Sequence, residues 1–166
     1  MHRYQILMEY VGTNFYGWQY QKKQITIQGT VEKILKKILK EKVKLYGSGR
    51  TDSKVHAIEQ SAHFDVKNKI HNIQKFFKTL NFFLNGMFIT VVKIKKRPLT
   101  FHARYSAKKR IYKYLIHNRE SLPSIDRDRG WYVKKKLDYQ LIKKASYFLK
   151  GTHDLSVFRA SNCSAS

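Results

Sequence analysis

The sequence has 166 residues, enough for one compact domain with its own core or slightly more. A hydrophobic fraction of 42% and an aromatic fraction of 14% are typical of folded proteins and exclude a disordered chain. Lysine and arginine total 34 against 11 acidic residues, which gives a formal net charge of +23. A polyanion would neutralise such self-repulsion, so RNA or DNA is the favoured partner. The alternative is a lysine-rich surface that only keeps the protein in solution.

Cysteine content and hydropathy bear on the cellular compartment. Cys163 is the only cysteine, so neither an intramolecular disulfide nor a thiolate metal cluster can form. No uninterrupted apolar stretch reaches the length of a membrane span, and the N-terminus lacks the apolar core and cleavage site of a signal peptide. We therefore expect a soluble protein of the reducing cytoplasm, with no membrane partner.

The N-terminal part alternates between strand and helix patterns. Residues 3–11 alternate like a strand and end at a turn-forming Gly-Thr-Asn sequence. Thr26 suits the N-cap of a helix over 27–40, whose shared apolar face comprises Val31, Ile34, Leu35, Ile38 and Leu39. A short strand is predicted at 43–46, and a longer one begins at Ile58. That strand places Ile58, Ala62, Phe64 and Val66 on one face, and Glu59, Ser61, His63 and Asp65 on the other.

A second helix and a fourth strand complete this unit. Apolar residues have helical spacing over 72–84, and Phe88 to Ile94 is a continuous apolar run typical of a buried strand. The order β-α-β-β-α-β is that of ferredoxin-like domains. We therefore predict an α/β protein of the α+β type, with a four-stranded antiparallel sheet and both helices on one face.

The remaining residues add to that unit, so we expect two domains, 1–98 and 99–166. A strand is predicted at 109–117, a polar loop at 118–130 and a helix at 138–150 with Asp138 as its N-cap. The expected inner face of this helix comprises Leu141, Ile142, Ala145, Phe148 and Leu149.

The segment GSGRTDSKVHA, residues 47–57, should form a loop at one edge of the sheet, between the second and third strands. Arg50 and Asp52 are two apart, so they share a side in an extended stretch. A neighbouring guanidinium favours an ionised carboxylate, which suits a nucleophile or a base. The alternative is a hairpin turn in which Asp52 bonds its own backbone.

The histidines and basic clusters have less specific interpretations. No histidine pair has HExxH spacing, so no metal site is predicted. His56 is expected to close the loop by a hydrogen bond, and His102 and Arg104 either orient that loop or contact RNA. Trp18 is expected in the core. Three clusters could follow phosphates or form a solvated face: Lys95-Lys96-Arg97, Lys108-Lys109-Arg110 and Lys134-Lys135-Lys136.

GRTDSKVHA closely resembles the GRTDxGVHA motif of TruA-type tRNA pseudouridine synthases. Further matches follow in the family's order: EYVGTNFYGWQ (9–19), TIQG (26–29), FHARYSAKKRIYKY (101–114) and LKGTHDLSVFRA (149–160). The resemblance implies an isomerase that converts uridine to pseudouridine in the tRNA anticodon stem–loop, at positions 38, 39 and 40. It further implies no cofactor, tRNA as partner, and a homodimer as in the family.

The resemblance also assigns roles to single residues. Asp52 matches the catalytic aspartate, and Arg50 matches the arginine that displaces the target base from the RNA stack. Tyr112 matches the tyrosine that stacks on the target uracil, although IYKYLI also fits a strand whose tyrosines lie in a sheet core. Candidate RNA contacts are Lys54, His56, His102, Arg104, Lys108, Lys109 and Arg110.

Two departures from the family stand out. The family has Ala-Gly after the aspartate, where this sequence has Ser53-Lys54; a left-handed Lys54 would cost about 1 kcal/mol. In the family, a second ferredoxin-like unit follows the segment matching FRASNC and supplies an arginine that pairs with the aspartate. We therefore expect an incomplete pseudouridine synthase fold, which alone folds and exposes apolar surface but does not catalyse.

Two other functions remain open. One is a catalytically inactive RNA-binding module, and the other is a basic ribosomal or RNA-assembly protein. The combination of Arg50, Asp52 and Tyr112 argues against the latter, because a structural RNA binder has no need of it.

Overall fold

The computed structural model describes residues 1–158, which divide into two compact units at residues 112 and 113. Each unit is described by itself. Cys163 and most of the FRASNC segment lie outside the described residues. Within the described part of the chain, no helix combines the length and apolarity needed to cross a membrane.

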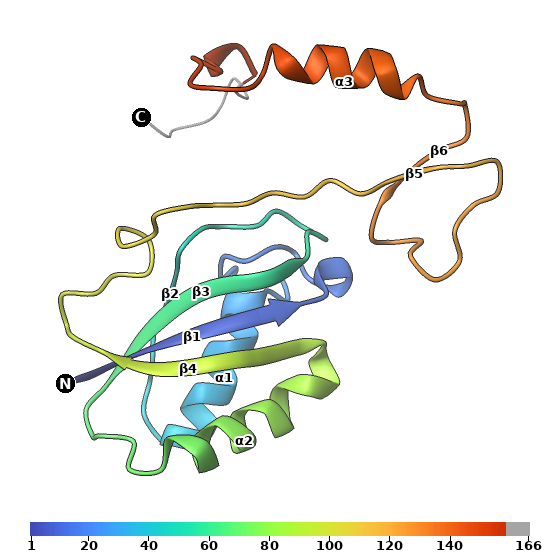
Figure 1. Ribbon diagram of the computed structural model, residues 1–166. Coiled ribbons are helices and arrows are strands. Elements are labelled where there is room, and N and C mark those ends of the chain that lie inside the picture. The colour runs from blue at the N-terminus through green and yellow to red at the C-terminus, as the bar shows by residue number, and fades with distance from the viewer. Residues whose placement is uncertain (159–166) are drawn as a thin grey trace. The chain divides into compact units, whose positions relative to one another are not determined.

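The first unit is built on a four-stranded antiparallel sheet (Figure 1). Its strands are β1 (His2–Tyr10), β2 (Leu45–Gly47), β3 (Ala57–Val66) and β4 (Ile89–Arg97), in the spatial order β2-β3-β1-β4. The first and third strands are therefore central, and β1 pairs antiparallel with both β3 and β4. The predicted antiparallel sheet and its element order are confirmed.

Both long helices of this unit lie on the same face of the sheet (Figure 1), as predicted. They are α1 (Ile27–Leu39) and α2 (Ile73–Leu84). Thr26 caps α1 by accepting a hydrogen bond from the Gly29 N–H, and Asn72 caps α2 in the same way. Three short 3-10 helices are also present: η1 (Gly12–Asn14), η2 (Asn85–Met87) and, in the second unit, η3 (Ser156–Phe158).

The core lies between the sheet and these helices. Alternate residues of the central strands face it, and the apolar stripe of each helix covers them. The fully buried side chains include Tyr4, Ile6, Met8, Leu35, Phe64, Leu80, Leu84 and Ile89. Trp18 is also buried, as expected. Because the helices cover one face only, the odd-numbered residues of β1 point to an open face.

Irregularities correct two sequence predictions. The β1–β3 register shifts between the pairs Met8–Gln60 and Tyr10–Ala57, which inserts one residue into β3. Beyond this bulge Ala57 packs against the core, whereas Ile58 is 77% exposed instead of lying with Ala62 and Phe64. The run from Phe88 to Ile94 does contain a strand, but the run is only partly buried. Ile89 and Val91 of β4 face the core, whereas Phe88 precedes the strand and Val92 sits where the β1–β4 register shifts, and both are exposed.

The second unit contains β5 (Ile116–Asn118), β6 (Trp131–Val133) and α3 (Tyr139–Tyr147). The predicted strand over 109–117 is wrong, because only its last two residues enter a strand. A strand needs a neighbour for its backbone hydrogen bonds, and no described segment forms a backbone ladder with 109–114. Asp138 caps α3 as predicted, accepting from the Leu141 N–H.

The apolar face predicted to be the inner side of the helix over 138–150 is not buried. All the residues of the predicted inner face are exposed: Leu141, Ile142 and Ala145 of α3, and Phe148 and Leu149 just after it. The prediction that this region exposes apolar surface is therefore confirmed for the described residues.

Candidate active site

Residues 48–56 form a loop that we call the Asp52 loop. Main-chain hydrogen bonds to the segment that follows β1 hold one side of this loop. The Trp18 N–H donates to the Thr51 carbonyl at 2.9 Å, and the Lys54 N–H donates to the Phe15 carbonyl at 3.1 Å. The hydroxyls of Tyr10 and Thr51 lie 2.9 Å apart. Burial raises the pKa of Tyr10 above its usual value, so this phenol is protonated and can donate to or accept from Thr51. The loop therefore has a defined conformation on this side.

Glycines let these two segments approach closely. Gly17 has a φ of +81°, and a β-carbon there would lie 2.8 Å from the Thr51 carbonyl oxygen. At Gly12 an added β-carbon would lie 2.1 Å from the Val55 carbonyl oxygen, which no real contact permits. Close packing against the Asp52 loop therefore requires glycine at both of these positions of the EYVGTNFYGWQ motif.

Three further contacts hold the start of the loop. The Ser48 N–H donates to the Ser61 carbonyl at 2.8 Å. Gln60 Nε2 donates to the Gly49 carbonyl at 2.6 Å, and Arg110 Nη2 donates to the Ser48 carbonyl at 2.9 Å. The segment from Ser48 to Lys54 is therefore anchored from both sides.

Arg50 and Asp52 lie between these anchors, and both are exposed. Among the described residues, the Asp52 carboxylate forms no ion pair or hydrogen bond, so Arg50 does not pair with it as their spacing suggested. The alternative in which the Asp52 side chain bonds its own backbone is also absent from residues 1–158. An anchored loop thus presents a carboxylate that a substrate can reach.

Lys54 has the left-handed conformation considered from the sequence. Its φ is +67°, and the Val55 N–H closes the turn by donating to the Asp52 carbonyl at 3.2 Å. A positive φ at this position of a turn favours glycine, which stands at this position of the motif that the sequence resembles. Lys54 therefore carries backbone strain two residues after Asp52.

His56 closes the loop as predicted. Its Nδ1 accepts a hydrogen bond from the Gly12 N–H at 3.2 Å, so the Nδ1 atom is unprotonated in this contact. This contact ties the end of the Asp52 loop to the residues that follow β1.

Tyr112 lies at the end of the first unit and is 74% exposed, while Tyr114 is 90% exposed. The alternative that placed both in a sheet core is wrong for the described chain. No hydrogen bond or ring contact in residues 1–158 joins Tyr112 to Arg50 or Asp52. The structure thus brings Arg50 and Asp52 into one loop but does not bring Tyr112 to them.

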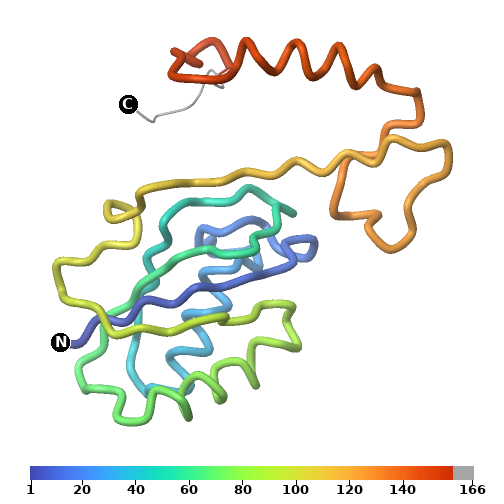
Figure 2. Tube along the Cα trace, viewed as in Figure 1, coloured from blue at the N-terminus to red at the C-terminus, as the bar shows by residue number. Residues whose placement is uncertain are grey.

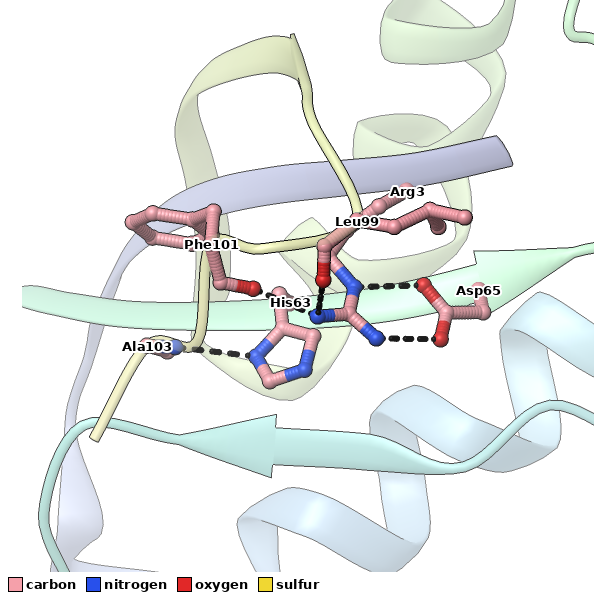
Figure 3. A network of polar contacts seen from close by, with 6 residues as sticks. All are labelled: Arg3, His63, Asp65, Leu99, Phe101 and Ala103. Carbon is pink, nitrogen blue, oxygen red and sulfur yellow. Dashed lines mark hydrogen bonds and ion pairs between the residues drawn. The ribbon is translucent and has the colours of Figure 1, made fainter. Parts of the chain in front are cut away.

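A polar network on the open face of the sheet anchors the segment after β4 (Figure 3). Sequence patterns did not predict this network. Arg3 binds Asp65 through two hydrogen bonds of 2.8 and 2.7 Å. Its Nη1 also donates to the carbonyls of Leu99 and Phe101, at 2.6 and 2.5 Å. The hydrogen bonds from Arg3 lower the pKa of Asp65, so the pair stays charged. Alternating polar residues at 61, 63 and 65 were the available signal.

His63 extends this network. It is buried, and its Nδ1 accepts from the Ala103 N–H at 3.1 Å (Figure 3). Burial, together with the nearby charges of Arg3 and His102, lowers the pKa of His63 to about 4. The His102 ring packs against His63 at 4.6 Å and against Tyr105 at 4.4 Å. His102 therefore has a packing role here, and Arg104 is exposed with its guanidinium 5.9 Å from the Tyr105 ring.

The same open face forms a shallow groove of about 350 Å³ beside the Asp52 loop. Residues 101–109 form one side of it, and the trace in Figure 2 follows the chain from β4 into this segment. Its cations are Lys93, Lys95, Arg97 and Lys109, against a single carboxylate at Glu59, and Ser48 of the loop also lines it. This charge suits a phosphate backbone. Lys108 is exposed but does not line the groove.

Comparison with known proteins identifies the class. Residues 6–106 match the family described as tRNA pseudouridine synthase, which covers more than half of the chain. The chain belongs to this family of isomerases.

Curated relatives place it more narrowly. The chain is 59% identical over 165 residues to the tRNA pseudouridine synthase A of Pelagibacter ubique strain HTCC1062. It is 42% identical over 167 residues to the protein of the same description from Thermoanaerobacter sp. strain X514. Each alignment covers 99% of this chain but 67% and 66% of the relatives. The chain thus spans about two thirds of their length.

Proposed function

We propose that this chain supplies the catalytic carboxylate of an enzyme that isomerises uridine to pseudouridine in the anticodon stem–loop of tRNA, at positions 38, 39 and 40. The observation that carries the proposal is Asp52: an exposed carboxylate on a loop anchored from both sides, next to a basic groove. Family membership supplies the reaction type, and the groove supplies the means to hold a polyanion.

In this reaction the bond between ribose C1′ and uracil N1 breaks, the ring turns, and C1′ bonds to C5. The C5 proton leaves and N1 gains a proton, so reactant and product have the same composition. Such an isomerisation calls for no redox or group-carrying cofactor. Asp52 acts by addition to uracil C6, by attack at C1′, or by taking the ribose 2′ proton. All three need an ionised, reachable carboxylate.

Arg50 and Tyr112 are proposed to handle the target base. A base stacked in RNA must leave the helix before an enzyme reaches it, and the planar cation of Arg50 can fill the gap. Tyr112 then provides an aromatic face for the uracil and helps to remove its C5 proton. The exposure of both side chains is compatible with contact to RNA.

The proposal extends to architecture and partners. We propose a ferredoxin-like catalytic part over 1–98 and, from 99, the start of a second part of the pseudouridine synthase fold. A cytoplasmic location and a homodimer are proposed with it. Lys109 of the groove, together with Lys54, Arg104 and Lys108, is proposed to contact RNA phosphates.

Tritium release from tRNA labelled at uracil C5 tests this function, because rearrangement to pseudouridine frees that hydrogen. The assay uses this chain and a chimera in which the C-terminal third of the Pelagibacter ubique relative follows residue 166. The chimera should release tritium from tRNA with uridine at 38, 39 or 40, and not from tRNA with cytidine there. No release from either tRNA would reject the proposal.

The second candidate is RNA binding without catalysis by this chain. It is favoured by the finding that no cation in residues 1–158 pairs with Asp52, since catalysis needs a fixed charge to hold the carboxylate ionised. The chain alone should then bind tRNA but release no tritium. Release by the chain alone at the rate of the chimera would rule this candidate out.

A further inference from the structure

Arg110 contacts the Asp52 loop from far away in the sequence. Its Nη2 donates to the Ser48 carbonyl at 2.9 Å, across 62 residues. Its Nε lies near Gly49, where an added β-carbon would be 3.7 Å away. The next carbonyl, that of Gly49, accepts from Gln60. Two successive carbonyls directly before Arg50 are therefore fixed by side chains.

The segment that carries Arg110 is itself anchored. Arg3 binds the carbonyls of Leu99 and Phe101, and His63 accepts from the Ala103 N–H. A turn follows, in which the Ser106 N–H donates to the His102 carbonyl at 2.7 Å. The segment that precedes Arg110 is thus fixed to the sheet. The hydrogen bond from Arg110 can therefore hold the Ser48 end of the Asp52 loop in a fixed position relative to the sheet.

Sequence patterns alone group Arg110 with Lys108 and Lys109 as a phosphate-binding cluster, but the contacts separate them. Lys109 lines the groove, and in the described chain no hydrogen bond joins it to the Asp52 loop. Arg110 instead donates to a backbone carbonyl of the loop, a charge-assisted hydrogen bond stronger than a neutral one.

We propose that Arg110 is a positioning residue, which fixes the Ser48 end of the Asp52 loop and through it Arg50 and Asp52. The proposal rests on the proposed function for its catalytic consequence but not for its structural one. Displacing a reacting group by about 1 Å can cost about 100-fold in rate. A phosphate contact would instead act on tRNA affinity and its salt dependence.

The test compares Arg110→Met, Arg110→Lys and Lys109→Met with the parent chain. Amide hydrogen exchange of Ser48, Lys54 and Trp18 reports the loop without any need for activity, and exchange of β1 amides reports global stability. Affinity for tRNA is measured over a salt series. Single-turnover tritium release is measured in the chimera described above.

Arg110→Met should exchange the Ser48 amide about fivefold faster, as expected for loss of one hydrogen bond, with β1 unchanged. Its salt slope should stay constant while the rate falls, and Arg110→Lys should recover part of the protection. Lys109→Met should do the reverse, lowering the salt slope by about 0.7 with unchanged exchange. Unchanged Ser48 exchange in Arg110→Met, or a lowered slope there, would overturn the proposal. A parent chimera that releases no tritium would reject the proposed function, and the exchange data would still decide the role of Arg110.

Discussion

Lys54 is a residue with a side chain at a position whose backbone conformation favours glycine. Its φ of +67° costs a side chain about 1 kcal/mol, partly offset in glycine by the greater freedom of the unfolded chain. Lys54→Gly should therefore raise the free energy of unfolding by about 0.5 kcal/mol. Lys54→Ala removes the same charge but keeps the β-carbon, and should give no gain. Urea unfolding measures both variants, and equal stabilities would contradict the strain argument.

His63 predicts a pH dependence of stability. Its pKa is about 4 in the folded protein against 6.5 for the free side chain, so between these values the unfolded chain binds the extra proton. The stability from His63 is complete above pH 6.5 and is lost as the pH falls towards 4, by up to about 3 kcal/mol. His63→Asn keeps an acceptor for the Ala103 N–H and should flatten this part of the curve. Parallel urea-midpoint curves for parent and variant would contradict the prediction.

At the scale of elements, the Arg3 network joins β1, β3 and the segment after β4. Arg3→Met leaves the Asp65 carboxylate and two carbonyls without their donor, in a site where the paired side chains are only 15% and 18% exposed. We expect a loss of about 2–3 kcal/mol. The exposed Arg129–Asp126 pair is the control, since Asp126→Asn should change stability by less than about 0.5 kcal/mol. A loss no larger for Arg3→Met than for the control would contradict the anchoring role.

Local rules predicted most elements of the first unit. The alternation of residues 3–11, the Thr26 cap and the apolar stripe of α1 depend on neighbours within a few positions, and these were confirmed. The bulge that exposes Ile58 was missed because it depends on the register between two strands. The strand predicted over 109–117 was wrong because pattern cannot supply a pairing partner.

The candidate site was also predictable only in part, because the sequence pattern shows local features but not the contacts between distant segments. A short motif led to Asp52 and Arg50, and the loop position of both residues follows from the order of the strands. The partners that hold this loop come from distant segments, as with Arg110 at Ser48 and Gln60 at Gly49. Arg3, His63 and Asp65 were missed because a polar outer face of a strand ordinarily faces solvent.

At the scale of the molecule, the charge of +23 should make tRNA binding strongly salt-dependent. Each phosphate contact displaces counterions, so log K should fall linearly with log salt. Lys95→Met in the groove should reduce the slope by about 0.7–0.9, whereas Lys33→Met on the exposed side of α1 should not. A flat plot for the parent chain would mean that the charge does not serve phosphate binding.

The central claim, that Asp52 is the catalytic carboxylate, is tested most directly by Asp52→Asn in single-turnover tritium release with the chimera in excess over tRNA. The substitution keeps the shape of the side chain and removes its charge. It should abolish release while tRNA affinity stays within about threefold or tightens, because one negative charge leaves a basic surface. Release by the purified Asn variant at an appreciable fraction of the parent rate, with deamidation excluded by mass spectrometry, would contradict the account.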